Sequence, residues 1–334
     1  MAAITLNADV LRLVIRQAAL EAERSNSSSL IDGFYQRSAT LRRLSLVNPQ
    51  WKYLAQLELQ SYIVLTTRNF NNVSKALEQN RMASRVRRLV DRRGVTREQR
   101  SLGEMLGKLE GLNELDCQNS RFSLNNLTRL QNLATIALSN VTLCGDTKNL
   151  RLPFRLRSFT LTGASTIRKE DWQTLKSTGV SNIEHVELSG RQTSNPSFLL
   201  DALSGWLPSV RTLELADILI STPLVPSLHL CRQLERLSIK LSDFPSALAV
   251  LGCSPRHLEI VASSEVIDDW TFIDYQTIIL YAVGKEPLEQ LETVRVSRAP
   301  GIQDSLGSRE TALLVKIGRR KTKAAGLSHG VAPR

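Results

Sequence analysis

Short stretches with the same order of apolar and variable positions recur along the middle of the chain. Each has an apolar residue, two variable residues, a second apolar residue, one variable residue and a third apolar residue, and we call the apolar residues the first, second and third places. The stretches are Leu112/Leu115/Cys117, Leu133/Ile136/Leu138, Leu156/Phe159/Leu161, Ile183/Val186/Leu188, Val210/Leu213/Leu215, Leu234/Leu237/Ile239, Pro255/Leu258/Ile260 and Leu291/Val294/Val296. Their first places lie 21, 23, 27, 27, 24, 21 and 36 residues apart. A pattern of this kind at a period of about 20–29 residues predicts repeated units, each adding one strand to a parallel sheet.

The phase of the pattern predicts which side chains leave the core. The second and third places point inward, so the residues between and beside them face out on the concave side of the sheet. The polar residues predicted there are Glu114, Asp116, His185, Glu187, Glu214, Arg236, Lys240, His257, Glu259 and Arg295. They are our candidates for a partner-binding face, with charge complementarity setting its specificity. The alternative is that they form an ordinary solvated sheet surface.

The repeated pattern resembles the leucine-rich repeat, whose units combine a strand with a returning helix or loop. The resemblance implies an α/β fold: an irregular leucine-rich-repeat solenoid with parallel strands inside and helices or loops outside. Regular families place asparagine or cysteine eight residues after the first place, whereas the chain has Ser120, Val141, Ala164 and Arg191 there. We therefore expect no asparagine ladder and an irregular solenoid.

The repeats extend upstream in a weaker form. Val86 and Leu89 fit the first two places, although Asp91 does not fit the third, and the stretch around Tyr62 and Val64 is a candidate first strand. The expected organisation is a helical segment over residues 1–60, the repeats over 61–300, and a basic, disordered tail over 301–334.

The amino-terminal segment carries two apolar half-motifs. Leu6-Asn-Ala-Asp-Val-Leu11 opens an amphipathic stretch, and LSLVNPQW follows from Leu44 to Trp51 after a serine-rich link. This layout resembles an F-box or F-box-like domain, with asparagine in place of the usual proline at position 7. The resemblance implies a small helical hairpin that docks on a Skp-type adaptor, itself bound to a cullin scaffold. The adaptor-binding residues that it implies are Leu6, Val10, Leu11, Val14, Ile15, Leu44, Leu46, Val47 and Trp51.

Two interpretations follow from the order of these parts. An F-box-like segment followed by irregular leucine-rich repeats resembles the substrate receptors of cullin-RING (SCF-type) ubiquitin ligases, whose repeats bind the target protein. The alternative is a leucine-rich-repeat interaction scaffold without a ligase role, in which the first helices only cap the solenoid and Leu44 and Trp51 belong to their own core.

The amino-acid composition is typical of a repeat protein, and the distribution of charge argues against nucleic acid as the partner of the whole protein. Leucine supplies 54 of the 334 residues, while aromatic residues make up 5%. The net charge is +11, but residues 81–100 and 309–334 each carry +6, so the remainder sums to −1. A nucleic-acid-binding field over the whole protein is therefore not expected. The arginines at positions 85, 87, 88, 92 and 93 are interpreted as a solvated edge of the early repeats.

The chain shows no constellation typical of an enzyme. The four histidines and four cysteines have no metal-ligand spacing, and no paired carboxylates lie in a glycine-rich setting. We expect a non-enzyme without catalytic residues, metal or cofactor. Widely spaced cysteines, the absence of a signal-like start and the lack of a long apolar segment predict an intracellular, cytoplasmic or nuclear protein without a membrane partner.

Overall fold

The computed structural model describes residues 7–25, 30–79, 83–93, 100–143, 150–179, 183–189, 203–216, 230–241, 255–262, 292–298 and 312–316. The helices in these ranges are α1 (Ala8–Ser25), α2 (Leu30–Leu44), α3 (Pro49–Ser61), α4 (Phe70–Gln79), α5 (Arg100–Leu106) and α6 (Lys169–Gly179), with 3-10 turns η1 (Ala83–Arg85), η2 (Leu124–Leu127) and η3 (Leu207–Ser209). The strands are β1 (Tyr62–Leu65), β2 (Arg88–Asp91), β3 (Glu114–Gln118), β4 (Arg121–Phe122), β5 (Thr135–Ser139), β6 (Thr142–Leu143), β7 (Ser158–Thr162), β8 (His185–Ser189), β9 (Thr212–Ala216), β10 (Arg236–Leu241), β11 (His257–Ala262), β12 (Thr293–Arg298) and β13 (Ala312–Lys316). The fold is therefore mixed α/β, with helices at its amino-terminal end.

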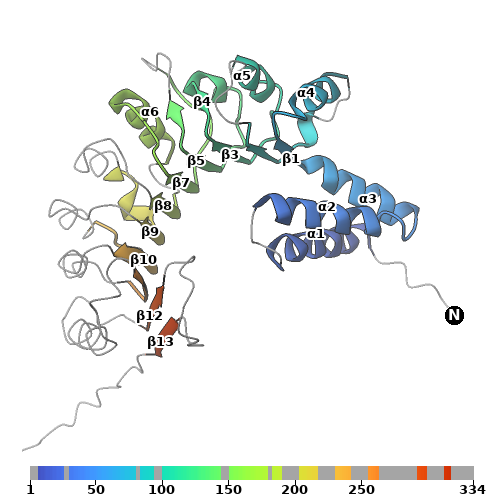
Figure 1. Cartoon of the computed structure of the whole chain (residues 1–334). Helices are drawn as coiled ribbons and strands as arrows, with labels where there is room; N and C mark the ends of the chain where they lie inside the picture. The colour runs from blue at the N-terminus through green and yellow to red at the C-terminus, as the bar shows by residue number, and fades with distance from the viewer. Residues whose placement is uncertain are drawn as a thin grey trace, which may run out of the picture.

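Eleven of the described strands form one sheet in sequence order, β1-β2-β3-β5-β7-β8-β9-β10-β11-β12-β13, and β4 and β6 pair in a separate two-stranded sheet. Neighbouring strands pair in parallel from β1 to β12, and β13 pairs with β12 in the antiparallel direction. Figure 1 shows the strands along the inner side of an arc, with α4, α5, β4 and α6 on its outer side. A parallel pair needs a crossover connection, which explains why the chain returns along the outer side between strands.

The predicted phase of the strands is confirmed by the register and by burial. Leu115 pairs with Ile136, Ile136 with Phe159, Phe159 with Val186, and so on to Val294, so the second places form one continuous row. Leu213 and Leu215 are 1% and 3% exposed, while Thr212 and Glu214 between and beside them are only half-buried. The side chains of Ile239, Ile260 and Val296, three of the third places, lie outside the described residues.

Two asparagines occupy the turns after the early strands, although the position that the regular repeat uses holds none. Asn119 and Asn140 follow β3 and β5 seven residues after the first place, one position earlier than the regular pattern, with φ of 48° and 52°. Asn140 Nδ2 donates to Asn119 Oδ1 at 3.1 Å, and the backbone N–H of Ala164 donates to Asn140 Oδ1 at 2.8 Å. Asparagine tolerates this left-handed conformation better than most residues. Gly163 occupies the equivalent turn after β7, with φ of 66°.

Replacing Gly163 with alanine should lower the free energy of unfolding by about 1–2 kcal/mol or more, because its backbone is left-handed. A Cβ there would also overlap the side chain of Asn140. Urea denaturation of the purified protein measures the effect. Gly107→Ala is the matched control, since the nearest atom to its Cβ would be 3.5 Å away. Equal losses in the two variants would contradict the assignment of the turn.

The first and last parts of the sheet contain departures from the prediction. Asp91 takes the third place on β2 despite its charge: it is buried, and its carboxylate accepts hydrogen bonds from Arg93 Nε at 2.8 Å and Nη2 at 3.0 Å. The guanidinium of Arg93 also lies 4.0 Å from the ring centroid of Phe70. The basic run is thus not simply a solvated edge. At the other end, β13 lies inside the tail that was expected to be disordered, because its apolar ALLVK sequence pairs with β12.

The amino-terminal segment has three helices rather than a two-helix hairpin. Asn48 caps α3 by accepting a hydrogen bond from the backbone N–H of Trp51 at 3.0 Å, and Pro49 takes the first helical turn. A new helix therefore starts inside the LSLVNPQW motif. Leu11, Ile15, Ala19, Leu41, Leu54 and Ala55 form a core for the three helices, separate from the core beneath the sheet.

Buried charges join the helices to the sheet. Arg37 on α2 contacts Glu58 on α3 at 2.6 Å and Glu23 on α1 at 3.8 Å, and its side chain is 6% exposed. Glu23 also contacts Arg88 on β2 at 2.9 Å. Both guanidiniums lie over the ring of Tyr62 on β1, at 5.2 and 4.7 Å from its centroid. We call Glu23, Arg37, Glu58, Tyr62 and Arg88 the junction.

The junction lies on the concave side of the first two strands, in the same row as Glu114. Tyr62, Val64 and Val90 are buried there, and Phe34 of α2 packs against them. Figure 1 accordingly shows α1–α3 at the β1 end of the arc. The concave face is therefore covered at this end and begins beyond β2.

Candidate functional site

The concave face presents three rows of side chains across the strands. The middle row runs from Asp116 on β3 through Ala137, Thr160, Glu187, Glu214, Ser238 and Glu259 to Arg295 on β12. The row beside it, toward the start of each strand, carries Glu114, His185, Arg236 and His257, and Lys240 belongs to the third row. The register and burial thus place eight of the ten predicted concave residues on one face, and Lys240 and Arg295 occupy the corresponding strand positions. The side chains of Lys240 and Arg295 lie outside the described residues.

Two carboxylates meet at the centre of this face. Glu187 and Glu214 are direct partners on β8 and β9, and no ion pair involving either occurs among the described residues. Burial raises the pKa of Glu187, and the nearby carboxylate of Glu214 raises it further. Thr160 Oγ1 donates a hydrogen bond to Glu187 Oε2 at 3.3 Å. Like charges directly opposite one another destabilise a sheet, so this pair lowers stability unless another group neutralises it.

The charges at both ends of the face are compensated within the chain. Arg236 contacts Glu259 at 2.6 Å, and His257 Nδ1 lies 2.9 Å from Thr293 Oγ1. At the β3 end, Glu114 contacts Arg88 at 3.3 Å. Burial raises the pKa of Asp116, while the positive charges of Arg92 and Arg88 oppose that shift. The uncompensated acidic charge therefore concentrates at Glu187 and Glu214.

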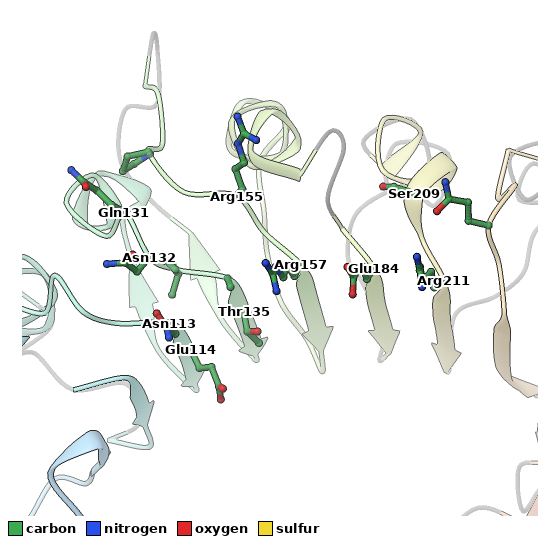
Figure 2. A pocket seen from close by; sticks show the side chains of 14 residues that line it. Asn113, Glu114, Gln131, Asn132, Thr135, Arg155, Arg157, Glu184, Ser209 and Arg211 are labelled. Carbon is green, nitrogen blue, oxygen red and sulfur yellow. The ribbon is translucent and has the colours of Figure 1, made fainter. Parts of the chain in front are cut away.

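A polar groove follows the edge of the sheet where the strands begin, with a volume of about 1100 Å³. Figure 2 shows Arg157, Glu184 and Arg211 in a row at the starts of β7, β8 and β9, with Arg155 and Ser209 on the loop side. The buried first places Leu156, Ile183 and Val210 explain this arrangement. Because each first place points into the core, its neighbours in the sequence point toward solvent. Arg157 and Arg211, which follow a first place, lie on one side of the groove, and Arg155 and Ser209, which precede one, lie on the other.

One wall of this groove belongs to a charge pattern that the sequence reasoning missed. The residue after each first place alternates in sign along six strands, as Arg157, Glu184, Arg211, Glu235, Arg256 and Glu292. We call this the edge ladder. Arg211 and Glu235 form an ion pair at 3.6 Å. Aligning the repeats and reading the column after the first place would have revealed it.

The amino-terminal candidates divide into a buried and an exposed set. Leu11 and Ile15 are each 1% exposed inside the helical core, and Leu44 and Trp51 are partly buried against it. Val10 and Val14 are 45% and 46% exposed, and Leu46 and Val47 are 84% and 58% exposed. Leu11 and Ile15 are therefore unavailable to a partner, which corrects that part of the prediction. Leu6 lies outside the described residues.

The exposed apolar residues gather at one end of the helical segment. Val10, Leu13 and Val14 lie one turn apart on α1, where residues three and four apart are neighbours. Leu41 at the end of α2 shares a core with Leu11 near the start of α1, so the turn that carries Leu46 and Val47 lies at the same end. We call Val10, Leu13, Val14, Leu46 and Val47 the apolar end. It is separate from the concave face, so the chain has two candidate surfaces rather than one site.

The described residues contain no centre for metal binding or thiol chemistry. No group of three metal-ligating side chains occurs among them. Cys117 and Cys231 are buried and unpaired, and burial raises the pKa of both thiols, that of Cys231 to about 12. A thiol with such a pKa is not a nucleophile near neutral pH. None of the described helices combines the length and apolar character needed to cross a membrane.

The sequence matches neither a known protein-family model nor a curated protein. One solved structure with a partial likeness is the LRR ectodomain of the plant membrane receptor kinase GASSHO1/SCHENGEN3 from Arabidopsis thaliana, in complex with CASPARIAN STRIP INTEGRITY FACTOR 2. It is 13% identical, covers 63% of this chain and has a TM-score of 0.21. The chain spans 34% of the length of that structure. A likeness of this size establishes neither a shared fold nor a shared function.

Proposed function

We propose that this chain is a substrate-recognition adaptor of a cullin-RING ubiquitin ligase. Its F-box-like helices bind a Skp-type adaptor through the apolar end, and the concave face binds a target protein. The protein catalyses no reaction itself and contributes to ubiquitin transfer by positioning the target.

The exposure of the apolar end is the observation that carries this proposal. Five apolar side chains stay outside although the same helices bury Leu11, Ile15 and Leu41 completely. Apolar residues that a helical segment leaves outside its own core, here on α1 and in the turn between α2 and α3, are suited to contact with a partner. The junction supports the proposal, because the partly buried ion pair of Glu23 on α1 with Arg88 on β2 ties the helices to the sheet. A partner on the helices would then be held in a defined position relative to one on the concave face.

The sheet, in this proposal, is the inner side of an irregular leucine-rich-repeat solenoid. The sequential parallel strands, the row of buried second places from Leu89 to Leu258 and the asparagine turns after β3 and β5 support it. Repeat architectures of this kind use their concave face to bind partners.

The double substitution Leu46→Asp/Val47→Asp should weaken binding of a purified Skp-type adaptor at least about tenfold, because it places charges in a contact that must be desolvated. Both residues are exposed, so the thermal midpoint of the variant should stay close to that of the wild type. Tyr35→Asp, at another exposed apolar residue of α2, is the control and should change binding by less than about twofold. Biolayer interferometry with immobilised adaptor measures all three proteins.

A second function, an interaction scaffold without a ligase role, is favoured by a different observation. Phe34 of α2 covers Tyr62, Val64 and Val90 on the first two strands, as a helical cap would. If the wild-type protein fails to bind a Skp-type adaptor, the ligase proposal is wrong and the scaffold remains. Loss of binding in the Tyr35→Asp control to the same extent as in the double variant would also count against the apolar end.

A further inference from the structure

The groove at the strand starts contains a charge spacing that neither the apolar end nor the concave face explains. Three residues of the edge ladder line one wall of it, Arg157, Glu184 and Arg211, so that two arginines lie two strands apart with Glu184 between them. Neighbouring strands lie about 4.8 Å apart, so Arg157 and Arg211 are separated by about 10 Å along the groove.

The backbone along this edge offers little to a ligand. The carbonyl oxygen of Arg157 accepts hydrogen bonds from the backbone N–H groups of Glu184 at 2.8 Å and His185 at 3.1 Å. The carbonyl oxygen of Glu184 accepts from those of Arg211 and Thr212, both at 2.9 Å. Because the strands satisfy these groups between themselves, recognition in the groove must come from side chains.

Three arginines and two glutamates, Glu114 and Glu184, line the groove, and Glu114 is paired with Arg88 outside it. Arg155 and Arg157 stand on the two walls, both exposed, and neither has a carboxylate within ion-pair distance among the described residues (Figure 2). Arg211 forms an ion pair with the exposed Glu235 at 3.6 Å, and an ion pair between exposed side chains is weak in water. Asn132 and Ser209 add neutral polar groups. A guanidinium has five N–H donors and binds carboxylate and phosphate groups in a bidentate manner.

We propose that the groove binds an extended peptide segment that carries anionic side chains three residues apart. A segment of the polyproline II type repeats its side-chain direction every three residues, with a rise of about 9 Å per repeat. That distance matches the separation of Arg157 and Arg211 and lets the segment pass Glu184 without placing an anion beside it. Arg155 contacts the segment from the opposite wall. The groove is a further site beside the two surfaces of the proposed function, and the inference does not rest on that proposal.

Labelled 12-residue peptides and fluorescence anisotropy test this spacing. The probes are (Glu-Pro-Ser)4, its phosphoserine counterpart (pSer-Pro-Ser)4, (Lys-Pro-Ser)4, and an isomer of the first with its four glutamates consecutive. We expect the full chain to bind the two spaced anionic peptides at least about tenfold more tightly than the lysine peptide or the isomer. Comparing the two anionic peptides shows whether carboxylate or phosphate is preferred.

Substitutions locate the binding site. Arg157→Ala/Arg211→Ala should weaken binding of the spaced anionic peptides at least about tenfold, because it removes two charge-assisted contacts. Arg68→Ala/Arg121→Ala removes the same charge from exposed positions outside the groove and should change binding by less than about twofold.

The inference would be overturned if neither spaced anionic peptide bound, if the isomer bound equally well, or if the two double variants lost equal affinity. Tighter binding of a uridine dodecamer than of the peptides would also overturn it, since the groove would then be a nucleic-acid site. Adaptor binding by Arg157→Ala/Arg211→Ala should match the wild type. A failure of the groove is therefore distinguishable from a failure of the ligase proposal.

Discussion

Replacing Leu213 with alanine should lower the free energy of unfolding by about 2–5 kcal/mol. Leu213 is 1% exposed on β9 and pairs with Val186 and Leu237 on the neighbouring strands, so its loss leaves a cavity in the continuous row of second places. Urea denaturation followed by circular dichroism measures the change.

Glu214→Ala, one residue along the same strand, is the matched control. Its side chain is on the concave face opposite Glu187, and removing it should change stability by less than about 0.5 kcal/mol or raise it slightly, because the repulsion between the carboxylates disappears. A loss for Glu214→Ala that equals or exceeds that for Leu213→Ala would mean that the strand phase is wrong by one residue. The residues assigned to the concave face and to the groove would then both be wrong.

Removing the guanidinium of Arg37 should cost about 3–5 kcal/mol, because it leaves the carboxylate of Glu58 without its buried partner, while Glu23 keeps its contact with Arg88. Arg37 is at the centre of the junction and also lies over the ring of Tyr62. The loss should be partly local to the helices, so hydrogen exchange should speed up in α1–α3 before it does in the sheet.

Arg16→Ala, on the exposed side of α1, is the control for this prediction and should cost less than about 0.5 kcal/mol. If Arg37→Ala is equally mild, Arg37 does not hold α1–α3 together or fix them over Tyr62 of β1. The proposed function would then lose its explanation for a fixed geometry between two bound partners, although each surface could still be tested separately.

The asparagine turns show where a sequence pattern needs structural knowledge to be applied correctly. The sequence contains Asn119 and Asn140, but the regular repeat pattern predicts the turn asparagine one position later, where the chain has Ser120 and Val141. Which of two neighbouring residues takes the left-handed conformation depends on where β3 and β5 end, and strand ends are set by pairing. The edge ladder was missed for another reason, because its residues become neighbours only when the repeats are stacked.

The sequence by itself determined the repeat and its phase. Burial alternates along a strand, so apolar residues at alternate positions, such as Leu213 and Leu215, already specify which side chains point inward. The same pattern in each repeat specifies which residues of neighbouring strands lie side by side. Only the tertiary structure decided the exposure of the helical residues. Val10 and Leu11 are adjacent, equally apolar and on one helix, yet only Leu11 faces α2 and α3. Exposure depends on which neighbours pack against a face, and the linear order of residues does not contain that information.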